Sequence, residues 1–314
     1  MLRDPGTRTR IEKLVIPPAW QEVWICPWPN GHIQATGVDA AGRLQYRYHD
    51  AWRLQRDQAK HERVLAMARR LPAARERVAT DLALRGMPRQ RVLAAATRLL
   101  DLGFFRIGSD EYAEEHGSYG LTTLLRSHVS LRRRPPAAVF DYVAKSGVHR
   151  VQTISESTVL QVVSELRRRR SGPPELLACR EGGRWVRVGA EDVNAYLDEI
   201  FEAESAGPVT AKDFRTWHGT ILMALALAVS EVPPMPEARR RRNLARAYQE
   251  VAHYLGNTPA VCRASYVDPR LVELWDRGRT IRHSLDRLGT QTGIGELATQ
   301  GPVEDAVRTL LEGA

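Results

Sequence analysis

The chain has 314 residues, of which 43% are hydrophobic and 26% are charged, and this ordinary globular composition argues against extensive disorder. The formal net charge of +9 indicates a polyanionic partner such as nucleic acid, because clustered lysines and arginines bind phosphates. The three cysteines, Cys26, Cys179 and Cys262, form no CxxC pair, which argues against a structural zinc site and a disulfide framework.

Two segments bear on where the protein works. The N-terminal segment MLRDPGTRTR is polar and lacks the apolar core of a signal peptide. The apolar run at 221–229 is about half of the ~18 residues that a membrane-spanning helix needs. We therefore expect a cytoplasmic protein with no membrane partner.

A small antiparallel sheet is predicted between residues 22 and 49, because Asn30-Gly31 is a strong hairpin signal and a second turn follows at 39–42. In the last strand, a period of two places Tyr46 and Tyr48 on one face. Gln45 and Arg47 fall on the other face. From the strand alone, half-buried tyrosines with solvated hydroxyls are favoured over tyrosines that contact DNA in a groove.

Helical spacing of alanine and arginine predicts a helix from Trp52 to Arg85. A second helix is predicted from Arg89 to Leu102, with Gly103 as its C-terminal cap. The break near Pro88 is a candidate hinge, so we divide the chain into a β-rich N-terminal lobe with linker helices, 1–88, and a larger lobe, 89–314. The fold class is α+β, with a mainly helical larger lobe that contains short β hairpins.

One of these hairpins is predicted between residues 138 and 154, where two apolar strands flank Ser146-Gly147 and place Lys145 at the tip. The following residues His149 and Arg150 receive no role. Another hairpin is expected around Gly182-Gly183. Neither hairpin shows chemistry by its pattern alone.

Tyr266 is the candidate nucleophile, because it ends a helical segment at a position that neither periodicity nor core packing requires. A phenol has a pKa near ~10, so it attacks phosphorus well only when nearby cations stabilise the developing charge. Arg106, Lys145 and Arg215 are candidate cations, since each is embedded among apolar or turn residues.

Simpler interpretations exist for two of these cations. Arg106 is equally compatible with a structural ion pair to Asp110 or Glu111. Most loop lysines are surface residues, and the pattern around Lys145 does not distinguish it from them.

Arg215 is harder to explain as a surface residue. Thr210 and Asp213 are spaced like a capping box, so Lys212 and Arg215 lie in the first two turns of a helix and share a face. Cations are disfavoured near a helix N-terminus unless an anion is bound there. The apolar continuation to Val229 anchors Arg215 at the edge of a core.

Four segments in this order resemble the type IB DNA topoisomerases, in particular the small bacterial members that are similar to the poxvirus enzymes. They are RIG with the following YGLTTL, the KSG hairpin, KDFRTW, and LGNTPAVCR followed by Tyr266. The resemblance covers nearly the whole chain, and it assigns the N-terminal lobe to DNA binding and the larger lobe to catalysis.

The resemblance also implies roles for single residues. Tyr266 is then the nucleophile and Lys145 the general acid, while Arg106, Arg215 and Asn257 stabilise the transition state. The implied DNA contacts are Gln45, Tyr46, Tyr48, Tyr112 and Lys212. Asn257 is a departure, because the viral and eukaryotic branch has histidine there, and an amide donates a hydrogen bond but brings neither charge nor proton.

The implied activity is relaxation of positive and negative supercoils through a 3′-phosphotyrosyl intermediate, without ATP, metal or cofactor. The expected partner is duplex DNA, which a monomer would close around as a clamp, in association with the nucleoid. The absence of GxxxxGK[ST], HExxH and acidic DxD motifs is consistent with this activity.

Two other functions stay open. A tyrosine recombinase uses similar chemistry, but that family usually shows HxxR-H-T where this chain has Lys212-x-x-Arg215-Thr216-Trp217. A noncatalytic basic DNA-binding protein would also fit the net charge. Removal of Tyr266 would leave the behaviour of such a protein nearly unchanged.

Overall fold

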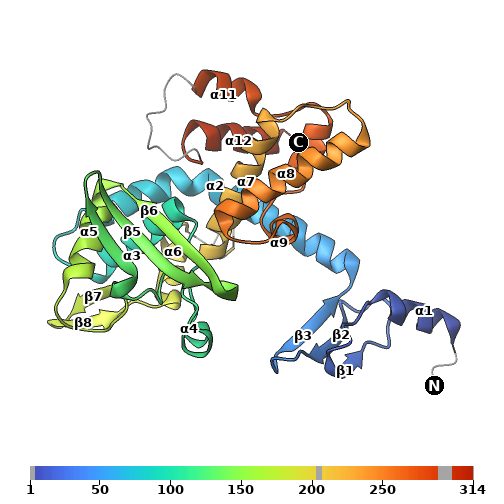
Figure 1. Ribbon diagram of the computed structural model, residues 1–314, viewed down its shortest axis with the longest axis horizontal. Coiled ribbons are helices and arrows are strands. Elements are labelled where there is room, and N and C mark those ends of the chain that lie inside the picture. Colours follow the sequence, from blue (N-terminus) through green and yellow to red (C-terminus); the bar gives the residue numbers. More distant parts are fainter. Residues whose placement is uncertain (1–3, 203–206, 289–298, 314) are drawn as a thin grey trace. The chain divides into compact units, whose positions relative to one another are not determined.

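The computed structural model describes residues 4–202, 207–288 and 299–313 (Figure 1). The chain divides into two compact units, Met1–Glu62 and Arg63–Ala314. The long helix α2, Asp50–Leu82, contributes residues to both units. The division into functional lobes at Pro88 stays a prediction.

The first unit is built on the predicted antiparallel sheet. Strands β1 (Gln21–Ile25), β2 (Ile33–Val38) and β3 (Leu44–Tyr48) pair in the order β1-β2-β3, which confirms the predicted hairpins. The helix α1 (Pro5–Lys13) precedes them. Arg10 of α1 donates to the Gln34 side chain at 2.8 Å and to the Cys26 carbonyl at 2.7 Å, so α1 is tied to the sheet.

The second unit is mainly helical, which confirms the α+β prediction. Besides most of α2, its helices are α3 (Arg89–Gly103), α4 (Asp110–His116), α5 (Ser157–Arg168), α6 (Ala190–Ile200), α7 (Ala211–Val229), α8 (Glu237–Leu255), α9 (Pro259–Ser265), α10 (Arg270–Asp276), α11 (Arg282–Leu288) and α12 (Pro302–Glu312).

Two small sheets interrupt the helices. Strands β4 (Val129–Arg133), β5 (Pro136–Ala144) and β6 (Val148–Ile154) form an antiparallel sheet, and β7 (Ala178–Glu181) pairs with β8 (Arg184–Arg187). Between β5 and β6 lies the short 3₁₀ turn Lys145–Gly147, which confirms the hairpin predicted around Lys145. The β7–β8 pair confirms the hairpin predicted at Gly182-Gly183.

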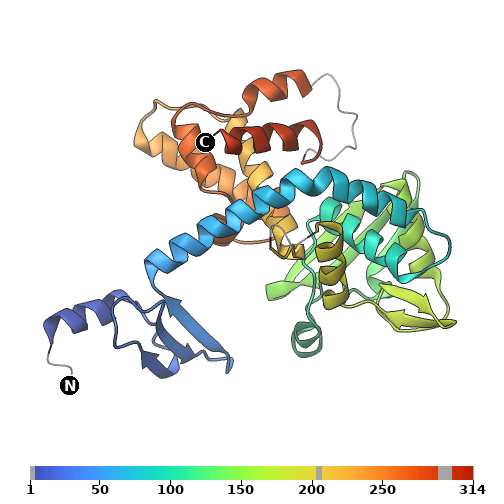
Figure 2. The same ribbon diagram turned by 180° about the vertical axis from the view of Figure 1, so that it is seen from behind.

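The helix α7 is central to the core of the second unit. Phe214 and Trp217 of α7 are among the largest fully buried side chains of this core. The helix is largely apolar, and packing against other elements removes its apolar surface from water. It packs against α8, α10, α11 and α12, and Figure 2 shows this arrangement from behind. The elements that carry the candidate site therefore rest on a rigid core.

One helix end differs from the prediction. The left-handed residue after α3 is Phe104, with a φ of 55°, and Gly103 is still helical. Gly103 is required for space instead, because a β-carbon there would collide with the ring of Phe105. The carbonyl of Phe104 accepts a hydrogen bond from Arg215, so this helix end contributes to the candidate site.

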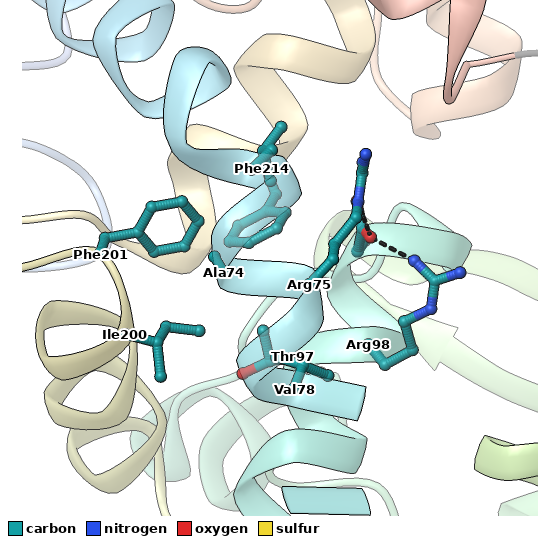
Figure 3. Close-up of a pocket in the computed structure, with 10 residues that line it drawn as sticks. Ala74, Arg75, Val78, Thr97, Arg98, Ile200, Phe201 and Phe214 are labelled. Atoms are coloured by element: carbon teal, nitrogen blue, oxygen red, sulfur yellow. Dashed lines mark hydrogen bonds and ion pairs between the residues drawn. The ribbon is translucent and has the colours of Figure 1, made fainter. Parts of the chain in front are cut away.

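A small cavity lies between α2, α3, α6 and α7, lined mainly by apolar side chains such as Ile200, Phe201 and Phe214 (Figure 3). The space open to the centre of a water molecule is about 10 Å³, which suffices for about one water. Thr97 Oγ1 lines the cavity and is buried without a hydrogen-bond partner, so it is suited to hold that water. A substrate does not fit here.

Candidate active site

The backbone of Arg106 is fixed by the segment that follows α4. Its carbonyl accepts from the Leu121 amide at 2.8 Å, and the Ile107 carbonyl accepts from the Thr122 amide at 2.8 Å. A β-carbon at Gly120 would lie 2.8 Å from the Arg106 carbonyl oxygen, so only glycine allows this approach. These contacts explain why RIG and YGLTTL occur together: the second segment holds the first.

The side chain of Arg106 does not form the ion pair that the sequence leaves open. Its Nη2 donates to the Gly256 carbonyl at 2.9 Å and also to Oδ1 of Asn257. Asp110 is paired with Arg187 instead. The structure thus brings Arg106 and Asn257 into direct contact across a sequence separation of 151 residues.

The start of α7 confirms the predicted capping pair. Asp213 Oδ2 accepts from the Thr210 amide and from the Thr210 hydroxyl, each at 2.9 Å. The other oxygen of Asp213 pairs with Arg63 at 2.8 Å. Lys212 is exposed, in contrast to Arg215 one turn further along, which is only 3% exposed.

Arg215 is a buried cation held by main-chain oxygens. Its Nη2 donates to the Leu255 carbonyl at 2.7 Å, and its Nη1 donates to the Phe104 carbonyl. Its guanidinium carbon lies 5.2 Å from the centre of the Tyr266 ring. Burial, and then repulsion from Arg106, lower the pKa of the Arg215 guanidinium to about 10, while Tyr266 acts in the opposite direction. The group remains charged at neutral pH.

The segment that carries Tyr266 begins with a capped helix. Thr258 Oγ1 accepts from the Val261 amide at 3.3 Å, and Pro259 occupies the first turn of α9, where its missing amide hydrogen costs no bond. Tyr266 follows the last residue of α9, with its amide bonded to the Cys262 carbonyl at 3.0 Å. The short helix α9 thereby sets the spacing between Asn257 and Tyr266.

The last turn of α8 is where three arginines meet. Arg150 of β6 donates to the His253 carbonyl at 3.3 Å and to the Tyr254 carbonyl at 2.9 Å. The next two carbonyls, of Leu255 and Gly256, accept from Arg215 and Arg106 respectively. A helix C-terminus attracts cations, because its last carbonyls lack intrahelical partners. Arg106, Arg150 and Arg215 are called the arginine cluster below.

The positive charge of the arginine cluster is not neutralised by carboxylates of the described residues. No ion pair joins any of its three members to a carboxylate within the described residues. Arg215 Nε and Asn257 Nδ2 are buried without hydrogen-bond partners. Buried donors without partners are costly, and a phosphate or phosphoryl oxygen would satisfy them. The arrangement is that of an anion site beside a tyrosine.

Lys145 belongs to a separate group. It is exposed at the β5–β6 turn, and its Nζ lies 5.0 Å from the centre of the Tyr112 ring. The structure thus brings Lys145 and Tyr112 together. In the described part of the chain, no hydrogen bond or ion pair joins Lys145 to Arg106, Arg215 or Tyr266.

The predicted DNA contacts of the first unit lie on two faces of β3. The rings of Tyr46 and Tyr48 are stacked 5.9 Å apart, which confirms that they share a face. Tyr48 also stacks on Trp52 at 4.5 Å. Gln45 donates to Asp39 at 2.9 Å on the opposite face. Whether these side chains contact DNA stays a prediction.

Sequence reasoning missed Arg150 and Gly219. A β-carbon at Gly219 of α7 would lie 2.8 Å from the Tyr266 carbonyl oxygen and 3.2 Å from its β-carbon. A glycine four residues after Arg215 was the available signal, because it falls on the same helix face. Arg150 has no comparable signal, since its partners lie 103 and 104 residues away.

The described residues contain no group of three or more His, Cys, Asp or Glu side chains that could hold a metal ion. They also contain no helix that is long and apolar enough to cross a membrane.

Comparison with known proteins identifies the family. The model of the eukaryotic DNA topoisomerase I catalytic core matches residues 49–291, and that of the bacterial DNA topoisomerase IB N-terminal domain matches residues 1–39. The DNA topoisomerase 1B of Acanthamoeba polyphaga mimivirus is 29% identical over 271 residues, which is 85% of this chain and 79% of that protein. The DNA topoisomerase I of Monkeypox virus is 22% identical over 76% of this chain and 71% of its own length. The chain therefore belongs to the DNA topoisomerase I catalytic-core family and is an enzyme of the type IB class.

Proposed function

We propose that this enzyme relaxes supercoils of both signs in duplex DNA by a metal-independent transesterification at Tyr266. The observation that carries the proposal is the arginine cluster, which lacks carboxylate partners among the described residues and includes a guanidinium 5.2 Å from the Tyr266 ring. Fixed cations beside a phenol supply what attack on a phosphodiester requires.

In the first step, the oxygen of Tyr266 attacks a backbone phosphorus and the bond from phosphorus to the 5′ oxygen breaks. The phenolic proton passes to water, and Lys145 donates a proton to the departing 5′ oxygen. The product is a 3′-phosphotyrosyl link and a free 5′ hydroxyl. Because the link conserves the phosphodiester, the reverse reaction rejoins the strand without ATP after the free end has rotated.

Arg106, Arg215 and Asn257 would stabilise the transition state, which carries more negative charge on its equatorial oxygens than the ground state does. Arg215 is suited to this because burial and two carbonyl bonds fix its orientation. Asn257 offers its unpartnered Nδ2 as a further donor. Lys145 Nζ lies 5.0 Å from the centre of the Tyr112 ring, and the proposal requires it to reach the 5′ oxygen once DNA is bound.

The remaining contacts concern DNA binding. Tyr46 and Tyr48, with Gln45 on the other face of β3, are suited to contact a groove, and Tyr112 and Lys212 to contact the backbone. We further propose that a monomer closes around the duplex and acts in the nucleoid.

The test is relaxation of supercoiled plasmid in EDTA without ATP. Wild type should relax plasmids of both signs and become covalently linked to DNA on addition of detergent. Tyr266→Phe should bind DNA but neither relax it nor form the link. Tyr248→Phe, at a half-buried tyrosine of α8, is the matched control and should behave as wild type.

Two results would overturn the proposal. Full activity of Tyr266→Phe would exclude Tyr266 as the nucleophile. A wild type that binds plasmid without relaxing it would favour the recombinase or the noncatalytic DNA-binding protein.

A further inference from the structure

Arg150 fixes the β5–β6 hairpin to the end of α8. Its two terminal nitrogens form a fork, with one bond to the His253 carbonyl at 3.3 Å and one to the Tyr254 carbonyl at 2.9 Å. A guanidinium can hold two acceptors in a defined geometry, whereas an ammonium is a single point of charge. The contact therefore restrains direction as well as distance.

Gly256 makes room for this contact. It ends α8 in the left-handed conformation, with a φ of 61°. A β-carbon at Gly256 would lie 3.0 Å from Nη1 and 3.2 Å from Cδ of Arg150. Any other residue here would both strain the backbone and crowd Arg150. The helix end is thus shaped for the guanidinium that it receives.

Arg150 lies in a positively charged environment, close to Arg106 and Arg215. Burial, followed by repulsion from Arg106, lowers the pKa of the Arg150 guanidinium, while Tyr142 acts in the opposite direction. Arg150 in turn adds to the repulsion on Arg215. Repulsion among the three arginines costs folding free energy, which the carbonyl contacts of Arg150 help to offset.

The strand links Arg150 to the catalytic lysine. Arg150 is the third residue of β6 and pairs with Tyr142 of β5, so about 10 Å of strand separates it from Gly147, the last residue of the turn that carries Lys145. The turn itself is tight, because Ser146 and Gly147 both have positive φ angles, of 66° and 72°. Movement of the hairpin at Arg150 would therefore displace Lys145.

We propose that Arg150 is a positioning residue for strand cleavage: its fork holds the hairpin on the last turn of α8 and so places Lys145 relative to Asn257. This inference rests on the proposed function, because it takes Lys145 as the general acid. Arg150 itself needs no contact with the phosphate. Its effect is then confined to the step in which the 5′ oxygen receives a proton.

The experiment compares two leaving groups in single-turnover cleavage by the full chain. One duplex carries the ordinary 5′ oxygen at a cleavage site mapped beforehand by covalent trapping, and the other carries sulfur at that position. A thiolate leaves without being protonated, so a defect in general acid catalysis disappears with sulfur. Wild type, Arg150→Gln, Arg150→Lys, Lys145→Ala and the Arg150→Gln/Lys145→Ala double variant are compared.

Arg150→Gln should slow cleavage of the oxygen substrate by about tenfold or more, within the limit that Lys145→Ala sets, which is ~10²- to 10⁴-fold. With sulfur, Arg150→Gln should approach the wild-type rate. The double variant should be no slower than Lys145→Ala, because both changes affect one step. Arg150→Lys keeps the charge but loses the fork, so its rate should fall between wild type and Arg150→Gln.

Controls separate this inference from the function on which it rests. Arg184→Gln, at an exposed arginine of β8, should match wild type on both substrates. An equal defect of Arg150→Gln on oxygen and sulfur, or wild-type activity of that variant, would overturn the positioning role. Cleavage by Tyr266→Phe would overturn the proposed function instead. Arg150→Lys keeps the test valid should Arg150→Gln fail to fold.

Discussion

The main chain of Tyr266 lies against Gly219, and the tyrosine carbonyl oxygen is 2.8 Å from where a β-carbon of residue 219 would stand. The adjacent Thr220 hydroxyl donates to the same carbonyl at 3.4 Å and accepts from the Asp268 amide at 3.2 Å. Residues 219 and 220 of α7 thus support the main chain of the segment that carries Tyr266. Arg215 lies one turn before them on the same helix.

Gly219→Ala should therefore displace Tyr266. Because the obstructing atoms are main-chain atoms that cannot rotate away, we expect covalent adduct formation to slow by about tenfold or more, which corresponds to at least ~1.4 kcal/mol of transition-state stabilisation. DNA affinity should change little. Gly6→Ala in α1 is the matched control, since its added carbon would meet only the Asp4 carboxylate at 3.5 Å. Unchanged cleavage by Gly219→Ala would show that the added β-carbon does not displace Tyr266, which contradicts the prediction.

Asn257→Asp should be more harmful than Asn257→Ala. Either change removes the unpartnered Nδ2 donor, which predicts a loss of about 10²-fold in single-turnover cleavage. The aspartate also places a negative charge beside Arg106 and near the incoming phosphate, so its loss should exceed that of alanine. Asn243→Asp, on α8 outside the site, provides the control. Equal cleavage rates for Asn257→Asp and wild type would exclude a role of Asn257 in transition-state stabilisation.

His218 should make the protein less stable in mild acid. Burial is the main cause that lowers the pKa of His218 to about 4. Attraction by Asp101 opposes this shift, whereas repulsion by Arg75 and Arg215 adds to it. The unfolded chain therefore takes up a proton first as the pH falls below about 6.5. The free energy of unfolding should decrease between pH 6.5 and 4 by up to about 3 kcal/mol from this group and be unaffected by it above pH 7.

Urea unfolding at a series of pH values measures this effect. His218→Leu should flatten the decrease between pH 6.5 and 4, whereas His116→Gln, at an exposed histidine, should leave it unchanged. Identical acid profiles for wild type and His218→Leu would contradict the assignment.

Glu304→Gln should destabilise the fold without a specific effect on chemistry. Glu304 of α12 accepts from Arg75 of α2 at 2.6 Å and from the indole nitrogen of Trp217 at 2.7 Å, so it joins three helices. Removal of one partner from a buried charged network costs about 3–5 kcal/mol. Glu312→Gln, on the same helix but paired with the exposed Arg69, should cost less than ~1 kcal/mol. Similar losses of unfolding free energy in the two variants would disprove the network's role.

Local patterns were sufficient to predict most elements of the fold. The Asn30-Gly31 turn and the Thr210 and Asp213 capping pair are each determined by residues close in sequence, and the structure confirms them. The predicted end of α3 was wrong in detail: Gly103 is not the left-handed cap, and glycine is required there because the Phe105 ring packs against it. That packing cannot be read from helix propensity.

The site depends on contacts that no local pattern reveals. From the sequence, Arg106 could form an ion pair with Asp110 or belong to the site. Only the fold shows that it contacts Asn257. Arg150 was missed because its partners are carbonyls, which every residue carries and which leave no mark in a sequence. Family resemblance supplied Lys145, whose exposed position at a turn resembles that of ordinary surface lysines.

The choice of acceptors at the end of α8 affects how this protein can evolve. Because the arginine cluster binds carbonyl oxygens of residues 253–256, the side chains of His253, Tyr254 and Leu255 are not what it recognises. Substitutions there leave the acceptors in place as long as the helix persists. Gly256 is the exception, since its conformation and lack of a side chain are both used. The exposed side chains of His253 and Tyr254 can therefore change without altering the geometry of the cations, whereas Leu255 is fully buried in the core.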